Sequence, residues 1–314
     1  KKYYLIDRPA GSLDLKEPID MEGLKFQVNR PAEYRQIYFE AWRQMRDFFY
    51  DPGMHGLDWT KMRDKYAELL PHVEHRNDLS YVIGELISEL SIGHAYVGKG
   101  DRPEPERIKL GLLGARLSKH ESGFFRIDSI LNGANWNDKL RSPLTEPGVV
   151  AQEGWYITHV NGVRTDQLAN LYTELIGKNG QLVELTINEE PELEGGTTSL
   201  VKPLADESEL YYYNWVENNR RKVNRLSDGR IGYIHVPNMG RKGLNMFAKY
   251  FYPQLEKDAL IIDDRGNGGG NVSPMLIERL QRTIAMTSTA RNTDVYPNPF
   301  QTHVGPKTVL LDRY

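Results

Sequence analysis

The sequence predicts a multidomain protein of mixed α/β and α+β class, in which a helical subdomain, a mostly-β module and a βαβαβ parallel-sheet subdomain follow one another. Three observations support this: apolar residues recur at helical spacing in residues 29–105, short strand-like runs fill residues 106–204, and strands alternate with helices in residues 205–314. The 314 residues are enough for two or three domains. Residues 1–28 are expected to be a connector from an upstream domain.

The helical subdomain is expected to contain three helices, because its apolar residues recur every three or four positions. Residues with known preferences for helix ends mark the boundaries. They are Pro31 in the first turn of the first helix, Asp58 as the cap of the second, Asn77 or Asp78 at the start of the third, and Gly93 at its end.

The mostly-β module is predicted from short runs of apolar and β-branched residues. The expected strands are Lys109–Leu117, Phe124–Leu131, Trp155–Val160 and Leu182–Asn188. Asn161-Gly162 is a strong signal for a tight turn between strands. A helix is expected before the last strand, because apolar residues recur at helical spacing from Leu168 to Ile176.

The last subdomain alternates strands with helices, which predicts right-handed crossovers and a parallel sheet. The expected strands are Ile231–Val236, Ala259–Asp263 and Thr308–Leu311, the last reached through a long loop. Ala259–Asp263 is an unbroken apolar run, as expected for a strand buried on both faces. A glycine-rich loop, Gly266–Gly270, follows it.

The composition narrows the classes of partner and chemistry. The net charge of -3 gives no sign of nucleic acid or an anionic membrane as a partner, and no apolar run approaches the roughly 18 residues of a membrane span. The chain has no cysteine, which excludes a thiol nucleophile and thiolate metal sites. No histidine or carboxylate motif has metal-ligand spacing, so we expect neither a metal nor a cofactor.

The glycine loop is the strongest candidate for chemistry. Its backbone N–H groups, unobstructed by side chains, can converge on an anion at the carboxyl end of a parallel strand. The phosphate-binding patterns Gly-Lys-Ser and Gly-x-Gly-x-x-Gly are absent, which favours an oxyanion over a phosphate. The competing interpretation is a tight strand-to-helix turn that binds nothing.

Several blocks, in order, resemble the tricorn peptidases and the related carboxyl-terminal processing peptidases, and together they cover nearly everything after residue 28. The resemblance implies a PDZ-like β module and a parallel sheet of the ClpP/crotonase kind, truncated at its C-terminus. The blocks are Tyr38–Arg43, Phe48–Pro52, Met54–Trp59, Gly93–Tyr96, Gly111–Gly114, Gly229–Pro237 and Asp264–Gly270.

The resemblance also implies roles for individual residues. His94 would be the general base of a serine peptidase, and Gly270 would supply an oxyanion-hole N–H, with Gly269 beside it in the substrate-binding loop. The nucleophilic serine is expected just after Tyr314 and the supporting acid later still, so this chain alone is expected to be inactive. The loop Gly111-Leu112-Leu113-Gly114 would bind a peptide carboxylate in the PDZ-like module.

Two positions depart from the family pattern. Gly93 stands where the best-known members have a serine before the histidine. Ser288 stands where an aspartate selects basic residues next to the cut, and Asp294 lies nearby as a partial substitute. A preference for Lys or Arg substrates is therefore not expected from the residue at position 288 itself.

Other candidate residues have plainer interpretations. Ser273-Pro274 resembles a helix N-cap followed by proline more than a nucleophile. Asp263 and Asp264 are expected to form an ion pair with Arg265 and to cap the loop, and His235 is expected in the core or at an edge. The aromatic cluster Tyr211–Trp215 lacks a basic groove for stacking on bases, so it is expected in the core or an interface.

Two functions from different classes remain at this point. The first is a serine endopeptidase for short, unfolded peptides, and the second is a PDZ-containing peptide-binding scaffold with degenerate peptidase machinery, which Gly93 and Ser288 favour. The resemblance further implies a homo-oligomer, commonly a hexamer. It also implies a cytoplasmic location, with the periplasm or secretion as alternatives.

Overall fold

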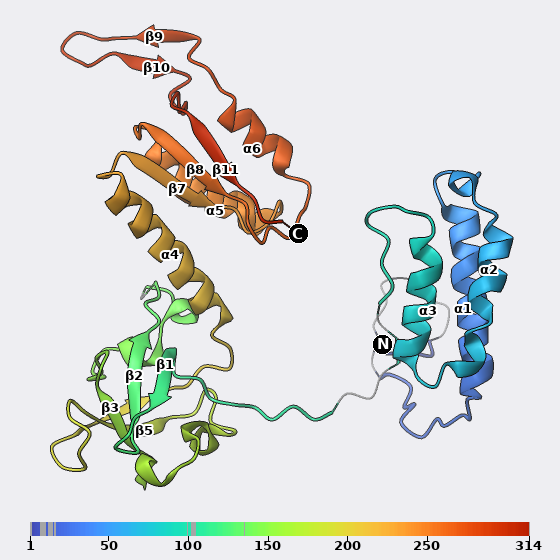
Figure 1. Ribbon diagram of the computed structural model, residues 1–314, viewed down its shortest axis with the longest axis horizontal. Helices are drawn as coiled ribbons and strands as arrows, with labels where there is room; N and C mark the ends of the chain where they lie inside the picture. Colours follow the sequence, from blue (N-terminus) through green and yellow to red (C-terminus); the bar gives the residue numbers. More distant parts are fainter. Residues whose placement is uncertain are drawn as a thin grey trace. The chain divides into compact units, whose positions relative to one another are not determined.

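A computed structural model describes residues 2–6, 11, 15, 17–98, 100–101, 105–134 and 136–313 (Figure 1). The chain divides into two compact units, Lys1–Glu106 and Arg107–Tyr314, and each is treated by itself. Parts of the predicted connector, the segment 102–104 and Tyr314 lie outside the described residues. Among the helices that the structure describes, none combines the length and the apolar character needed to cross a membrane.

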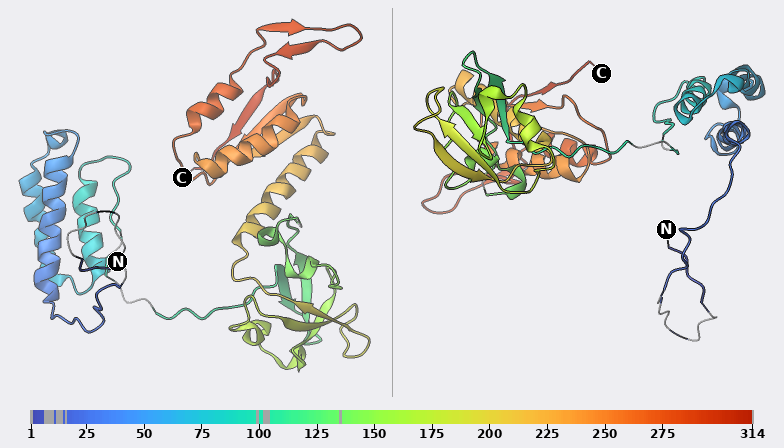
Figure 2. Two further views of the ribbon diagram at one scale, coloured as in Figure 1. Left: turned by 180° about the vertical axis from the view of Figure 1, so that it is seen from behind. Right: turned by 90° about the horizontal axis from the view of Figure 1, so that it is seen from below.

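The first unit contains three helices that pack side by side, seen nearly end-on in the right-hand view of Figure 2. They are α1 (Arg30–Phe48), α2 (Trp59–Ala67) and α3 (Arg76–Ser88), with short 3-10 turns at Met54–Gly56 and Leu70–His72. Asp58 caps α2 as predicted, since its carboxylate accepts from the Lys61 N–H at 2.9 Å.

The predicted ends of α3 need correction. The helix begins at Arg76, ahead of the predicted Asn77 or Asp78, because His75 and Asp78 form a reciprocal capping box. It ends at Ser88, so the prediction that Gly93 stops it was wrong. Ser91, with φ at 52°, turns the chain away before Gly93 is reached.

The core of the first unit lies between the three helices. The indole N–H groups of Trp42 and Trp59 each donate to the other residue's carbonyl, at 2.8 and 3.1 Å. These two contacts join α1 to the start of α2. The buried core residues are Tyr34, Tyr38, Trp42, Met54, Trp59, Leu79, Val82, Ile83, Leu86, Ile87 and Leu90.

The second unit begins with an antiparallel sheet in which the strands are ordered β1-β2-β3-β5-β6, with β4 paired to β3. The strands are β1 (Ala115–Lys119), β2 (Phe125–Ile130), β3 (Tyr156–Val160), β4 (Val163–Arg164), β5 (Val183–Asn188) and β6 (Thr197–Val201). Asn161 and Gly162 form the predicted tight turn between β3 and β4, with φ at 49° and 77°.

Two predictions for this module differ from the structure, and two strands were missed. The expected helix before β5 is replaced by two 3-10 turns, Thr165–Gln167 and Leu171–Leu175. The strand expected from Lys109 begins only at Ala115, and the preceding residues form isolated bridges instead. The strands β4 and β6 were not predicted. Two further 3-10 turns lie at Asp138–Leu140 and Pro143–Thr145.

A three-stranded parallel sheet follows, in the order β11-β8-β7, which confirms the predicted parallel sheet. Its elements are α4 (Ser208–Leu226), β7 (Ile231–His235), α5 (Arg241–Phe251), a 3-10 turn (Tyr252–Gln254), β8 (Ala259–Asp263), α6 (Ser273–Leu280) and β11 (Lys307–Leu310). The long loop expected before β11 contains a projecting hairpin, β9 (Met286–Ser288) paired with β10 (Tyr296–Asn298) (Figure 1).

The core of this sheet is formed by β7, β8, α5 and α6 together. Its buried residues are Ile234, Val236, Phe247, Tyr250, Phe251, Leu260, Ile262 and Leu276. The aromatic cluster Tyr211–Trp215 belongs to α4, which packs against β7. The carboxyl ends of β7, β8 and β11 thus meet at one edge, where the glycine loop begins.

Candidate active site

The glycine loop after β8 leaves one backbone N–H without an acceptor. Among the described residues, every N–H from Asp264 to Val272 donates within the chain except that of Gly270. The acceptors are Leu310 O for Asp264, Asp263 Oδ1 for Arg265, the Asp312 carboxylate for Gly266, Asp264 O for Asn267, Pro237 O for Gly268, Asn267 Oδ1 for Gly269, and Met239 O for Asn271 and Val272. An exposed N–H in a loop otherwise held by hydrogen bonds is suited to receive an anionic oxygen.

Gly270 must be glycine for steric reasons. Its φ is 142°, and a Cβ placed there would lie 2.2 Å from the Met239 carbonyl oxygen. The close approach arises because Met239 and Gly270 form a parallel bridge, which extends the pairing of β7 and β8. The backbone contact therefore fixes both the residue type and the direction of the free N–H. Gly269, with φ at 75°, donates to Asn267 instead.

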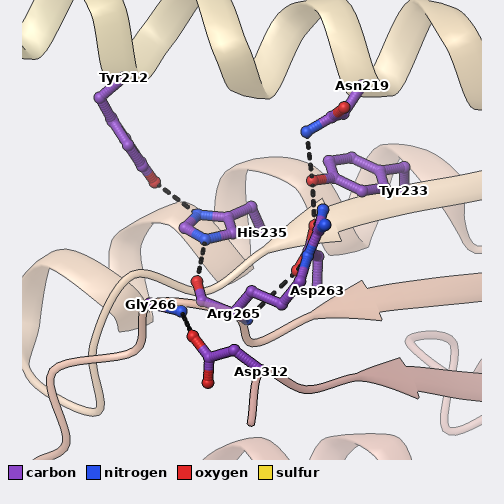
Figure 3. A network of polar contacts seen from close by, with 8 residues as sticks. All are labelled: Tyr212, Asn219, Tyr233, His235, Asp263, Arg265, Gly266 and Asp312. Atoms are coloured by element: carbon purple, nitrogen blue, oxygen red, sulfur yellow. Dashed lines mark hydrogen bonds and ion pairs between the residues drawn. The ribbon is translucent and has the colours of Figure 1, made fainter. Parts of the chain in front are cut away.

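The base of the loop is held by an ion pair between the buried carboxylate of Asp263 and the exposed guanidinium of Arg265. Arg265 binds both carboxylate oxygens of Asp263, at 2.8 and 2.5 Å, as the sequence predicted. The Tyr233 hydroxyl donates to the same carboxylate at 2.7 Å (Figure 3). Burial opposes ionisation of Asp263, but these hydrogen bonds outweigh it and lower its pKa. Asp263 is therefore an ionised anchor and not a proton donor.

Asp264 behaves differently from its neighbour. It accepts a hydrogen bond from the Asn267 side chain at 2.9 Å and so caps the loop, as predicted. Burial nevertheless raises its pKa. Its backbone N–H pairs with Leu310 of β11, so the residue contributes to the sheet edge through its main chain.

The buried imidazole of His235 lies at the end of β7, as expected for a core residue. Its Nε2 donates to the Arg265 carbonyl oxygen at 3.0 Å, and the Tyr212 hydroxyl contacts Nδ1 at 2.9 Å. A pocket of about 410 Å³ lies on this side of the loop. Its lining residues are Tyr212, Trp215, His235, Pro237, Lys242, Arg265 and Gly266.

Ser273 is the first residue of α6 and not its N-cap, which corrects the prediction. Val272 occupies the capping position, and no side chain caps the helix there. Pro274 lies in the first turn, as the sequence indicated. Among the hydrogen bonds of the described residues, none joins the Ser273 hydroxyl to a histidine.

The proposed specificity residues lie in the hairpin that projects beyond α6. Ser288 ends β9 and pairs with Tyr296 of β10. Asp294 is exposed and lies between the two strands in sequence. A hairpin rather than an open loop therefore carries both residues.

His94 belongs to the first unit, whereas the glycine loop belongs to the second. The contacts of each are therefore given within its own unit. The residue is exposed and has φ at 61°, which is uncommon for a non-glycine residue. Its Nδ1 lies 3.1 Å from the Tyr96 hydroxyl. His55, also exposed in this unit, has φ at 53°, so the backbone conformation alone does not single out His94.

The loop Gly111–Gly114 already uses most of its N–H groups within the chain. Gly111 donates to Leu175 O and Leu112 donates to Leu204 O, both at 2.8 Å, while the Leu113 side chain is buried in the core. The Gly114 N–H donates to the Glu207 carboxylate at 2.9 Å. Burial, partly offset by that hydrogen bond, raises the pKa of Glu207.

Several contacting residues were not predicted from the sequence. Tyr212, Glu207 and Asp312 had no motif that marked them, and His235 was expected only as a packing residue. One signal was available: His235 ends a strand directly beside the one that leads into the glycine loop. Polar residues at the carboxyl ends of parallel strands share one edge of the sheet.

Comparison with known proteins gives three successive domain matches. They are the tricorn protease C1 domain over residues 30–88, the tricorn protease PDZ domain over residues 111–206, and peptidase family S41 over residues 230–310.

Curated relatives show the same likeness. Tricorn protease homolog 1 of Streptomyces coelicolor is 34% identical over 96% of this chain and 28% of its own length. A second tricorn protease homolog of that organism is 36% identical over 96% of this chain and 26% of its length. The tricorn protease homolog of Saccharolobus solfataricus is 34% identical over 90% of this chain and 26% of its length.

A solved structure agrees with the sequence relatives. A crystal structure of the tricorn protease matches with a TM-score of 0.83 and 28% identity, covering 95% of this chain and 29% of that one. The chain thus spans between a quarter and a third of the length of these relatives. The chain belongs to the tricorn protease family and carries its C1, PDZ and S41 peptidase domains.

Proposed function

We propose that this protein is a serine endopeptidase that cleaves short, unfolded peptides. His94 is the general base, Gly270 supplies one oxyanion N–H, and the nucleophile is a serine that follows β11. The observation that carries the proposal is the Gly270 N–H, which alone among its described neighbours has no acceptor. A donor held in place before the reaction stabilises the charge of a tetrahedral intermediate without reorganisation.

The geometry at His94 is compatible with the role of base. When Nδ1 carries the hydrogen and donates it to the Tyr96 hydroxyl oxygen, Nε2 keeps a free lone pair. That nitrogen takes up the proton of the attacking serine and returns it to the leaving amine.

The end of β11 is tied to the glycine loop, which supports a nucleophile in this region. The Asp312 carboxylate accepts from the Gly266 N–H, and Leu310 accepts from the Asp264 N–H. A serine that follows this strand would emerge at the same edge of the sheet as Gly270.

The test uses the full-length protein and a fluorogenic peptide. His94→Ala is expected to lower kcat/KM by about 100- to 10,000-fold, the usual contribution of a general base. His72→Ala removes another exposed histidine of the same unit and serves as the matched control, with wild-type activity expected. Equal activity in wild-type protein and the His94→Ala variant would exclude the assigned base.

Substrate contacts are proposed for three places. Gly269 contributes main-chain contacts beside the oxyanion, and Ser288 occupies the specificity position, with Asp294 as a nearby charge. The PDZ-like module holds a peptide end at Gly111–Gly114, where an incoming carboxylate has to displace Glu207 from Gly114. Cleavage of a peptide library with Ser288→Asp against wild type tests the second assignment, with a gain for Lys and Arg expected.

A peptide-binding scaffold is the second candidate, favoured by Gly93 and Ser288 at positions where family members carry functional side chains. A fluorophosphonate probe distinguishes the two functions in the full-length protein. Labelling that is lost on active-site competition supports the peptidase. Peptide binding without labelling supports the scaffold.

We also propose that the protein is a cytoplasmic homo-oligomer, a hexamer by likeness to its family. Family membership is the support for both statements. Light scattering coupled to size exclusion measures the assembly, and fractionation of the native host measures the compartment. A monodisperse monomer, or the mature protein in a secreted fraction, would contradict the respective statement.

A further inference from the structure

One peptide group at the start of the glycine loop forms hydrogen bonds to side chains through both its C=O and its N–H. The carbonyl oxygen of Arg265 accepts from His235 Nε2 at 3.0 Å. The N–H of the same peptide group, on Gly266, donates to the Asp312 carboxylate. Figure 3 shows the two contacts on opposite sides of this peptide group. His235 belongs to β7, and Asp312 lies in the segment after β11. These two strands flank β8 in the sheet.

The chemistry of the acceptor determines the state of His235. A carbonyl oxygen only accepts, so the hydrogen of the neutral ring lies on Nε2 and is donated to Arg265. Nδ1 is then an acceptor for the Tyr212 hydroxyl, at 2.9 Å. Trp215 packs edge-on against the ring, with 4.8 Å between centroids. Two hydrogen bonds with different roles and one packing contact therefore orient the imidazole.

This peptide group lies at the start of the glycine-rich segment. Gly266 has φ at 67° and begins a segment with three successive glycines, Gly268–Gly270. Glycines lose more conformational freedom on ordering than other residues. The bridge to Met239 holds Gly270 at the far end of this loop, and the 265–266 peptide group fixes the near end, four residues earlier.

We propose that His235 and Asp312 are positioning residues that clamp the Arg265–Gly266 peptide group and thereby hold the Gly270 N–H in place. The inference rests on the proposed function for its catalytic consequence, whereas the clamp itself is a property of the fold. Neither side chain is proposed to touch substrate. Tyr212 acts through His235, by fixing the orientation of its ring.

Two amide substitutions separate the roles of the two ring nitrogens. His235→Gln places an amide N–H near the position of Nε2 and keeps a donor for Arg265. His235→Asn places a carbonyl oxygen near the position of Nδ1 and keeps only the acceptor for Tyr212. Asp312→Ala removes the other half of the clamp at an exposed position, where loss of the fold is not expected.

The experiment measures hydrogen exchange of fragments spanning residues 264–272 and steady-state cleavage of a fluorogenic peptide, both in the full-length protein. His235→Asn and Asp312→Ala are expected to speed exchange about tenfold or more and to lower kcat about 10- to 100-fold, with KM within about threefold of wild type. His235→Gln is expected to restore both quantities to within about threefold. His72→Asn, at an exposed position of the first unit, is the control and should change neither quantity.

The outcomes separate this inference from the proposed function. If His235→Asn and His235→Gln behave alike, or if neither His235→Asn nor Asp312→Ala changes exchange, the clamp is wrong. If wild-type protein cleaves no peptide, the proposed function is wrong, and the exchange measurement alone still decides whether the clamp exists.

Discussion

Glu207 is a carboxylate in a site that favours its neutral form. Burial raises its pKa, so its contribution to stability is present below its unfolded pKa and is lost as pH rises through the folded value. Glu207→Gln keeps a carbonyl acceptor for the Gly114 N–H and removes the charge. We expect a higher melting temperature than wild type at mildly alkaline pH, and a flatter pH dependence, measured by differential scanning fluorimetry.

Glu209 provides the control for that measurement. It is exposed and pairs with Lys242, so Glu209→Gln is expected to keep the wild-type pH dependence. A melting temperature of Glu207→Gln below that of wild type at alkaline pH would show that the charged carboxylate is needed.

Gly93 offers a residue-scale test of the catalytic constellation. A Cβ at this position would meet no atom within 4 Å, so serine fits without displacing its surroundings. Gly93→Ser is expected to change stability by less than about 0.5 kcal/mol. If the new hydroxyl hydrogen-bonds in the active site, kcat/KM rises by about three- to tenfold.

Thermal melting and peptide cleavage by the full-length protein measure both effects. Gly98→Ser, at another glycine of this segment with open space around its Cβ, is the matched control and should change neither. A fall in activity on Gly93→Ser with unchanged stability would argue against the family arrangement at this position.

At the scale of single residues, the sequence predicted the Asp58 cap and the ion pair at Arg265, but it misplaced the caps at Gly93 and Ser273 and predicted no distant partner. Asp58 and the Asp263–Arg265 pair act within a few residues of themselves, and such contacts follow from local spacing. Glu207 and Gly114 are 93 residues apart, and His235 and Arg265 are 30 apart. No local pattern encodes such contacts, because they depend on where the elements are placed by the fold.

The junction of α1 and α2 gives a test at the scale of elements. Trp59→Phe removes the indole donor to the Trp42 carbonyl but keeps an aromatic ring in the core. The expected loss is about 1–2 kcal/mol, from one hydrogen bond and a smaller side chain. Urea denaturation followed by circular dichroism measures it.

Trp136→Phe is the matched control, because Trp136 is 78% exposed. Its unfolding free energy should stay within about 0.5 kcal/mol of wild type. Equal losses in both variants would mean that the reciprocal Trp42–Trp59 contact contributes little.

Long elements with a regular apolar period were predicted well, whereas short elements and those without such a period were not. In β6, Ser199 points inward and is buried, whereas Leu200 is 60% exposed, so apolar alternation gave no strand signal. In α4, the consecutive tyrosines obscure the helical spacing of the residues that face β7. These residues, Tyr212, Trp215 and Asn219, are identified only by their contacts in the structure. The 3-10 turns before β5 share the spacing of a helix over too few residues to be told apart from one.

The whole chain contains separate cores, which predicts separable unfolding. The buried cluster of the first unit shares no residue with those of the second. Leu79→Ala, in α3, and Leu185→Ala, in β5, each remove a fully buried side chain. Each is expected to cost about 2–5 kcal/mol in its own unit.

Scanning calorimetry of the two variants measures that outcome. Each variant should lower the transition of one unit and leave the other within experimental error. A single transition that shifts equally in both variants would show that the units unfold together.

At this scale the sequence was most informative. Family blocks spaced along the chain predicted the membership that the domain matches confirm, and the order of strands and helices predicted the parallel sheet. The boundaries at residues 28, 105 and 204, and the roles of His94 and Gly270, stay predictions. Roles depend on chemistry that a fold match does not measure.

The satisfied amides around Gly270 have a consequence for ligand binding. Because each neighbouring N–H already has its partner, the ordering entropy of this loop was lost during folding and is not lost again when an anionic oxygen arrives. If Gly270 is the oxyanion donor proposed above, an inhibitor that presents a tetrahedral oxyanion, such as a boronate, gains affinity from a donor that neither moves nor exchanges partners. The same rigidity means that an inhibitor whose oxygen is misplaced would lose this hydrogen bond, because the backbone could not move to restore it.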